Sequence, residues 1–173
     1  MNILFIIPSL PNQLNRVRAL QILRALAREH DIHVISLTSE LQPDSSLLEH
    51  YCTRITLVHQ SFLRSLVECA CAVFSFTPLE VAYCRNSRMK RAVQKILDRE
   101  HIDLIYVKRL RSAQFIGDPR AIRIPVILDT TDAMSLFYEH LFRAVPWHRK
   151  LFIWSEWVRY RRYEEKLFRI FPH

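Results

Sequence analysis

The sequence predicts an α/β domain with a Rossmann-like parallel sheet and helices on both faces. Short apolar runs alternate with amphipathic stretches along the chain, and the first 37 residues are patterned as strand, loop, helix and strand. No internal repeat interrupts this alternation. In open sheets of this kind, ligands bind beyond the carboxyl ends of the strands. The loop over residues 9–18 is therefore the first place to look for function.

The first unit is the clearest part of the pattern. Asn2–Ile7 is a short apolar run with β-branched residues, which is typical of a strand buried on both faces. Pro8 and Pro11 end this strand, because proline has no N–H to donate within a sheet. Residues 17–30 carry apolar side chains at helical spacing and predict a helix with one broad buried face. The next strand is predicted over 32–37.

The remaining elements continue the alternation. Strands are predicted over 54–59, 103–107 and 125–129. Helices are predicted over 46–51, 61–76, 87–100, 110–116, from 132 onward and over 147–171. Ser87 and Asp132 are expected to cap the amino ends of two of these helices, and Gly117 is expected to cap the carboxyl end of another.

Length, composition and charge limit the function classes. A chain of 173 residues, half of them hydrophobic, suits one folded domain. Its formal net charge of +8 favours an anionic partner, such as nucleic acid, anionic lipid or a phosphorylated substrate. Nucleic acid is the least expected of these partners, because the basic residues form no recognisable reader motif.

Several function classes are disfavoured by what the sequence lacks. Its one glycine, Gly117, leaves no GxGxxG or Walker loop, which argues against dinucleotide dehydrogenases and P-loop NTPases. The four cysteines have no metal-ligand spacing with histidine, so we expect reduced, mostly buried thiols and no metal. No signal peptide is apparent, and the apolar stretch over 62–76 is interrupted by Arg64 and Glu68 and is too short to span a bilayer. A cytoplasmic protein is expected.

The loop after the first strand offers side-chain chemistry in place of glycine. Near the amino end of the following helix stand polar and basic residues, in which an arginine can bind an anion through two hydrogen bonds. They are Asn12, Gln13, Asn15, Arg16 and Arg18. A solvated loop with surface arginines explains the same residues equally well.

Two aspartates mark the end of the last predicted strand. A carboxylate that ends an apolar strand is costly unless it is paired, so Asp129 is expected to meet Arg18 across the crevice. Asp129 and Asp132 stand where a carboxylate can orient a substrate hydroxyl or act as a base. A simple helix cap, worth about 1 kcal/mol, is the favoured interpretation of Asp132.

Basic residues follow the strand over 103–107 at the same edge of the sheet. Lys108, Arg109 and Arg111 can bind an acceptor phosphate or a lipid diphosphate there. A solvated basic loop is the slightly favoured alternative.

The last helix combines an aromatic stripe with many arginines and lysines. Such a helix can lie in an anionic membrane interface. The favoured alternative is that the stripe packs on the sheet while the arginines are solvated, because a helix in this fold must bury one face. The stripe comprises Leu151, Trp154, Trp157, Val158, Tyr160, Leu167 and Phe171.

Three segments, in order, resemble one family of enzymes. They are ILFIIPSLP…RVRALQILRALAREHDIHVISL, PLEVAYCRNSRMKRAVQKILDREHIDLIYVKRLRSAQFI and PVILDTTDAMSLFYEHLFRAVPWHRKLFIWSEWVRYRRYEEKLFRIF. Together they resemble the N-terminal, acceptor-side domain of family-4 glycosyltransferases of the GT-B fold. The chain is most similar to the sugar transferases associated with bacterial exopolysaccharide and exosortase systems.

The resemblance implies a retaining, metal-independent transfer of sugar from a nucleotide-sugar donor to a glycan or lipid-linked acceptor, without a further cofactor. Residues 1–173 correspond to the acceptor-side domain, and the donor domain of the family lies outside them. The chain alone is therefore expected to be inactive. The alternative is a non-catalytic basic module that binds anionic membrane lipid or another polyanion, at the inner face of the cell membrane.

Site residues carry over only in part. Arg18, Asp129 and Asp132 match the family by position, whereas Leu14 stands where the family usually has a glycine near the donor diphosphate. Thr131 precedes Asp132 where many members have a histidine–aspartate pair. No catalytic residue is assigned. The candidate substrate-binding residues are Arg16, Arg18, Arg109, Arg111, Asp129 and Asp132.

Overall fold

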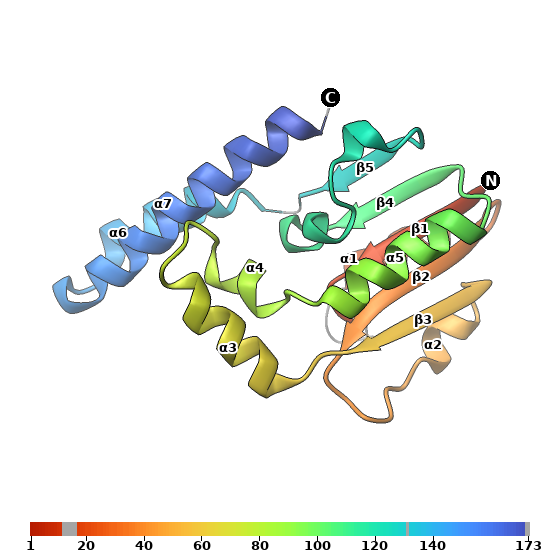
Figure 1. Ribbon diagram of the computed structural model, residues 1–173, viewed down its shortest axis with the longest axis horizontal. Coiled ribbons are helices and arrows are strands. Elements are labelled where there is room, and N and C mark those ends of the chain that lie inside the picture. Colours follow the sequence, from red (N-terminus) through yellow and green to blue (C-terminus); the bar gives the residue numbers. More distant parts are fainter. Residues whose placement is uncertain (12–16, 131, 172–173) are drawn as a thin grey trace.

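A five-stranded parallel sheet forms the centre of the molecule (Figure 1). The computed structural model describes residues 1–11, 17–130 and 132–171. The strands lie in the order β3-β2-β1-β4-β5, so the direction in which the chain adds strands reverses between β1 and β4. This confirms the predicted Rossmann-like fold class. The strands are β1 (Asn2–Ile7), β2 (Asp31–Thr38), β3 (Arg54–His59), β4 (Leu104–Lys108) and β5 (Val126–Asp129).

The helices follow the predicted order, with differences at their ends. The first helix ends at Leu26 rather than at residue 30, and the helix that begins at Phe62 ends at Ala72 rather than at 76. A short helix after Pro78 was not predicted. The helical segments are α1 (Val17–Leu26), α2 (Ser46–Glu49), α3 (Phe62–Ala72), α4 (Leu79–Tyr83), α5 (Ser87–Arg99), α6 (Met134–Ala144) and α7 (Trp147–Ile170), with 3-10 turns η1 (Leu110–Phe115) and η2 (Pro119–Ala121).

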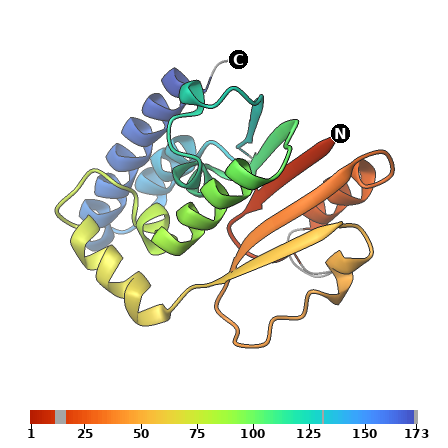
Figure 2. The same cartoon turned by 45° about the vertical axis from the view of Figure 1, so that its right-hand side comes forward.

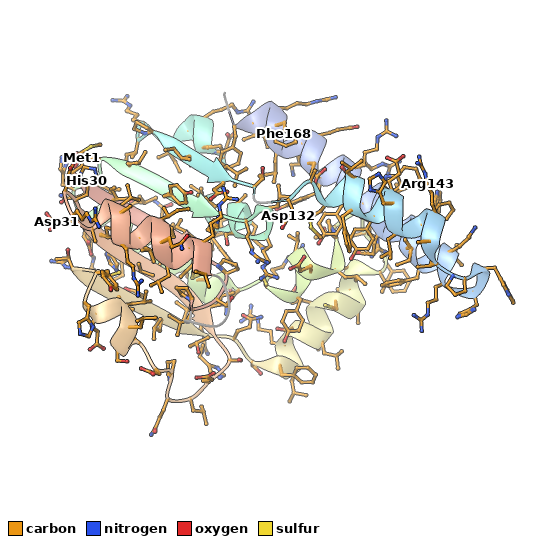
Figure 3. The ribbon with its side chains drawn as sticks, turned by 180° about the vertical axis from the view of Figure 1, so that it is seen from behind. Met1, His30, Asp31, Asp132, Arg143 and Phe168 are labelled. Carbon is orange, nitrogen blue, oxygen red and sulfur yellow. The ribbon has the colours of Figure 1, made fainter. Side chains whose placement is uncertain are left out.

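Each face of the sheet carries its own apolar cluster. On one face, Leu20 and Leu23 of α1 pack with Phe5 of β1, and Figure 3 shows α1 in front of the strands. On the other face, Met89 and Val93 of α5 pack with strand residues and with the carboxyl end of α7 (Figure 2). The prediction of helices on both faces is therefore confirmed.

Two predicted caps are provided by other residues. The N-cap of α5 is Asn86 rather than Ser87, and its side chain accepts hydrogen bonds from the N–H groups of Arg88 (2.9 Å) and Met89 (3.2 Å). Asp132 does not cap α6, whose N-cap is Ala133. A carboxylate from α7 takes this role, because the Ser135 N–H donates to Glu164 Oε1 at 3.2 Å.

The aromatic stripe of α7 is only partly covered. Leu167 is 6% exposed and packs in the cluster that includes strand residues, so the expected packing on the sheet is confirmed near the carboxyl end of the helix. Tyr160 is 1% exposed but stacks on Tyr138 of α6 instead. The expected packing is wrong for the amino half, where Leu151 and Trp154 are exposed. There α6 and α7 pack on each other in a hairpin that extends away from the sheet (Figure 1). Within the described residues, no helix has the length and apolar character needed to cross a membrane.

Candidate functional site

A buried carboxylate joins three elements at the carboxyl edge of the sheet. Asp129 ends β5 and pairs in register with Lys108 of β4. Its Oδ2 accepts hydrogen bonds from the Tyr106 hydroxyl (2.6 Å) and from Lys108 Nζ (2.5 Å). Arg18 Nη2, from α1, lies 3.5 Å from Oδ1. The predicted meeting of Arg18 and Asp129 is therefore present in the structure.

The position of Tyr106 follows from strand geometry. Residues two apart on a strand point to the same face, so Tyr106 and Lys108 both reach toward Asp129. The Tyr106 ring stacks on Phe5 with a centroid separation of 4.6 Å. An apolar contact thus fixes the ring that donates to the carboxylate.

Charge and burial oppose each other at Asp129. Burial by itself would raise its pKa, but hydrogen bonds from Lys108 and Tyr106, with the charges of Lys108 and Arg18, lower it below the usual range. Burial and the neighbouring carboxylate raise the pKa of Tyr106. Asp129 is therefore ionised at neutral pH, which suits an orienting hydrogen-bond acceptor better than a general base.

Two of the basic residues at the carboxyl end of β4 do not form a solvated loop. Lys108 is 5% exposed and pairs with Asp129. Arg111 forms an ion pair with Glu80 of α4, and the Tyr160 hydroxyl of α7 donates to the same carboxylate at 2.8 Å. The solvated-loop interpretation is thus wrong for both residues. Lys108 joins β4 to β5, and Arg111 joins the edge of the sheet to α4 and, through Glu80, to α7.

Arg109 lies between Lys108 and Arg111 and differs from both in its backbone conformation and in its side-chain contacts. Its φ of 70° and ψ of 146° lie in a region that glycine visits freely and other residues rarely do. Two backbone hydrogen bonds hold it there, from Arg109 N–H to Asp129 O (2.8 Å) and from Ser112 N–H to Arg109 O (3.0 Å). Strain of this kind costs roughly 1–3 kcal/mol and is concentrated at functional sites.

The Arg109 side chain is half-buried and available. Among the residues that the structure describes, none forms a hydrogen bond or an ion pair with its guanidinium. It borders a hollow of about 50 Å³ shared with Ser9 and Arg18, and a second hollow of about 30 Å³ shared with Asp132. The Ser9 hydroxyl is buried and has no hydrogen-bond partner within the described part of the chain. A buried hydroxyl without a partner beside an available guanidinium is the arrangement expected where a polar ligand binds.

The structure brings most of the candidate residues to one edge. Arg18, Arg109, Arg111 and Asp129 are grouped there, and the exposed Asp132 borders the smaller hollow. Arg16 lies outside the described residues, as do Leu14 and Thr131, so the interpretations that concern them have no structural counterpart. Ser9 and Glu80 were not among the candidates, although Ser9 begins the loop that the sequence favours.

Comparison with known proteins gives matches among solved structures. No protein-family model matches the chain, and no curated protein does either. UGT2 of Phytolacca americana complexed with UDP-2fluoro-glucose and pterostilbene matches 83% of this chain and 34% of its own, with 15% identity and a TM-score of 0.50. The chain has a glycosyltransferase-like fold.

Two further matches have lower TM-scores. They are apo UGT2 of Phytolacca americana (15% identity, 83% of this chain and 33% of that chain, TM-score 0.48) and a UGT transferase from Siraitia grosvenorii in complex with UDP (18% identity, 85% and 32%, TM-score 0.44). The chain therefore spans about a third of the length of the solved structures that it matches. At these identities the likeness concerns the fold.

The four cysteines differ in their exposure to solvent. Cys84 is buried, Cys52 and Cys69 are half-buried and Cys71 is exposed, so the expectation of mostly buried thiols is only partly right. In the part of the chain that the structure describes, no three histidine, cysteine, aspartate or glutamate side chains are grouped as a metal site requires.

Proposed function

We propose that this chain is the acceptor-side domain of a family-4-like glycosyltransferase. The complete enzyme would transfer a sugar from a nucleotide-sugar donor to a glycan or a lipid-linked acceptor. The observation that carries the proposal is the strained Arg109, whose guanidinium is available beside Ser9 and Arg18 at the carboxyl edge of the sheet. The glycosyltransferase-like fold supports it, as does the resemblance of the three sequence segments.

In this proposal the site binds an acceptor that carries phosphate. Arg109 and Arg18 would hold the phosphate or diphosphate, because a guanidinium matches two anionic oxygens at once. The Ser9 hydroxyl and the ionised Asp129 would hydrogen-bond the polar groups next to it. Lys108 and Tyr106 act as positioning residues, since both hold Asp129 in place.

The transfer itself needs a second domain in this proposal. The bond between the sugar and the donor diphosphate breaks, the acceptor oxygen bonds to the sugar carbon, and the hydroxyl proton passes to the departing nucleoside diphosphate. The donor nucleotide would be bound by a domain outside residues 1–173. We therefore expect this chain to bind acceptor groups without turning over a nucleotide-sugar.

The test is a titration followed by amide NMR. Dimethylallyl diphosphate serves as a water-soluble probe of lipid diphosphates. It is expected to shift the amide signals of residues 9, 18 and 109–111, and Arg109→Ala should weaken its binding about tenfold or more, because a hydrogen bond to a charged group is lost. Arg28→Ala is the matched control, since Arg28 is exposed in the turn after α1, at the opposite edge of the sheet.

Either of two results would contradict the proposed site. One is that shifts are confined to the amino edge of the sheet. The other is that Arg109→Ala and Arg28→Ala bind the probe equally well. Turnover of a nucleotide-sugar at enzymatic rates by this chain alone would overturn the assignment of the donor to a second domain.

A further inference from the structure

Helix α3 presents its apolar face to solvent and its polar face to the protein. The side chains of Phe62, Leu63, Leu66 and Val67 are all more than half exposed. In Figures 1 and 2 no other described element covers the outer side of α3. Phe74, just beyond the helix, is 95% exposed. A contiguous exposed apolar surface of this kind marks an interaction site.

Specific polar contacts hold the helix in this orientation. Ser65 is fully buried and accepts a hydrogen bond from Gln60 Nε2 at 2.6 Å. Glu68 pairs with Arg85 at 3.3 Å, on the segment that leads into α5. Turning α3 over would bury its apolar side chains, but it would break these contacts and leave polar groups of the neighbouring segments without partners. The outward apolar face is therefore built into the fold.

Charge beside α3 indicates what covers this face. Between α3, α5 and α7 lies a groove of about 870 Å³, whose lining includes six cationic and two acidic side chains. The acidic side chains, Glu68 and Asp118, are each paired with an arginine. Lys90 and Lys166 have no side-chain acceptor among the described residues, so they leave positive charge available. The cationic residues are Arg64, Arg85, Lys90, Arg120, Arg162 and Lys166.

An aromatic contact connects the apolar helix to α7. Arg162 stacks over the ring of Phe76, with its guanidinium carbon 4.0 Å from the ring centroid. Arg159 Nη2 donates to the carbonyl of Val73 at 2.9 Å. The exposed apolar segment and the basic part of α7 are therefore held next to each other.

We propose that α3 lies in the interface of an anionic lipid bilayer, with its outer apolar side chains among the acyl chains and the groove cations on the lipid phosphates. Its 11 residues extend about 16 Å, which is too short to cross an apolar core about 30 Å thick but suits a helix that lies in the membrane plane. The net charge of +8 complements such a surface. The inference does not depend on the proposed sugar transfer.

Co-sedimentation of the full chain with vesicles tests the proposal. Binding is expected to vesicles of phosphatidylcholine with phosphatidylglycerol, to be weak with phosphatidylcholine alone, and to fall as NaCl rises. Leu63→Gln should reduce binding about fivefold, whereas Leu41→Gln should not, although Leu41 is 91% exposed on a loop. Lys90→Gln should reduce it about fivefold and Lys95→Gln, an exposed lysine on the same helix outside the groove, should not.

Three results would overturn the proposal. The first is no binding to anionic vesicles, and the second is equal loss in Leu63→Gln and Leu41→Gln. The third is that Leu63→Gln alters self-association in size-exclusion chromatography without altering vesicle binding, which would identify a second copy as the occupant. Arg109→Ala is expected to retain vesicle binding, so failure at the membrane surface and failure at the acceptor site are distinguishable.

Discussion

Helices α3 and α5 are similar in length and are both amphipathic, yet they face the protein in opposite ways. Helix α5 places Met89, Val93 and Ile96 against the sheet and its basic residues in solvent. Helix α3 places Leu63 and Leu66 in solvent and buries Ser65. An apolar period of 3.6 residues shows that a helix has two faces, but it does not show which face meets the protein. The direction is set by partners elsewhere in the chain.

The two helices also differ in what their apolar side chains contribute to the stability of the fold. Apolar side chains that α5 buries stabilise the fold, whereas those that α3 exposes contribute little to it. Residues that break a local sequence–structure rule without stabilising the fold tend to lie on functional surfaces. Arg109 is a second such departure, in the backbone rather than in the facing of a helix.

Truncation of a side chain that α5 buries should destabilise the fold strongly. Met89 is 0% exposed, so Met89→Ala should lower the free energy of unfolding by about 2–5 kcal/mol. Leu66→Ala in α3 removes a similar volume but should change it by less than about 0.5 kcal/mol, because Leu66 is 57% exposed. Urea unfolding followed by circular dichroism measures both. Similar losses in the two variants would mean that the outer face of α3 is already covered.

The sequence predicts features that are set by local patterns, and it fails where distant partners decide. Strands were predicted because apolar β-branched runs are local signals, and the Arg18–Asp129 pair because an unpaired buried carboxylate is costly. Neighbouring polar residues compete for one N-cap, so the sequence indicates Ser87 as the N-cap of α5 where the structure has Asn86. The backbone strain at Arg109 depends on hydrogen bonds that its N–H donates to β5 and its carbonyl accepts from η1, which no local pattern reveals.

A buried ion pair and an exposed ion pair should differ in their contribution to stability. Asp129→Asn removes the charge opposite the buried Lys108 and should cost about 3 kcal/mol of unfolding free energy, since a buried cation would lose its partner. Asp118→Asn removes the partner of the solvent-exposed Arg120 and should have little effect. The pair of variants is compared by urea unfolding at neutral pH. Equal effects would show that the Asp129 carboxylate is not buried as described.

The contribution of Asp129 to stability should also depend on pH. The folded pKa of Asp129 is lower than its value of about 3.9 in an unfolded chain. Its contribution to stability is therefore fully present above about pH 5 and is lost as the pH falls through the folded pKa. The stability difference between wild type and Asp129→Asn should accordingly shrink as the pH decreases from 5 toward 3. A difference that stays constant over this range would contradict the lowered pKa.

Relief of the backbone strain at Arg109 should stabilise the fold slightly. Arg109→Gly relieves a backbone with φ of 70° and should raise the free energy of unfolding by about 0.5–1 kcal/mol, even though glycine gains more freedom in the unfolded chain. Arg91→Gly, in the exposed face of α5, should lower it by about 1 kcal/mol. Thermal unfolding gives the two signs directly. If Arg109→Gly is more stable and no longer binds dimethylallyl diphosphate, the strain at this residue is retained for its side chain; if it is less stable than wild type, the side chain has a structural role that outweighs the strain.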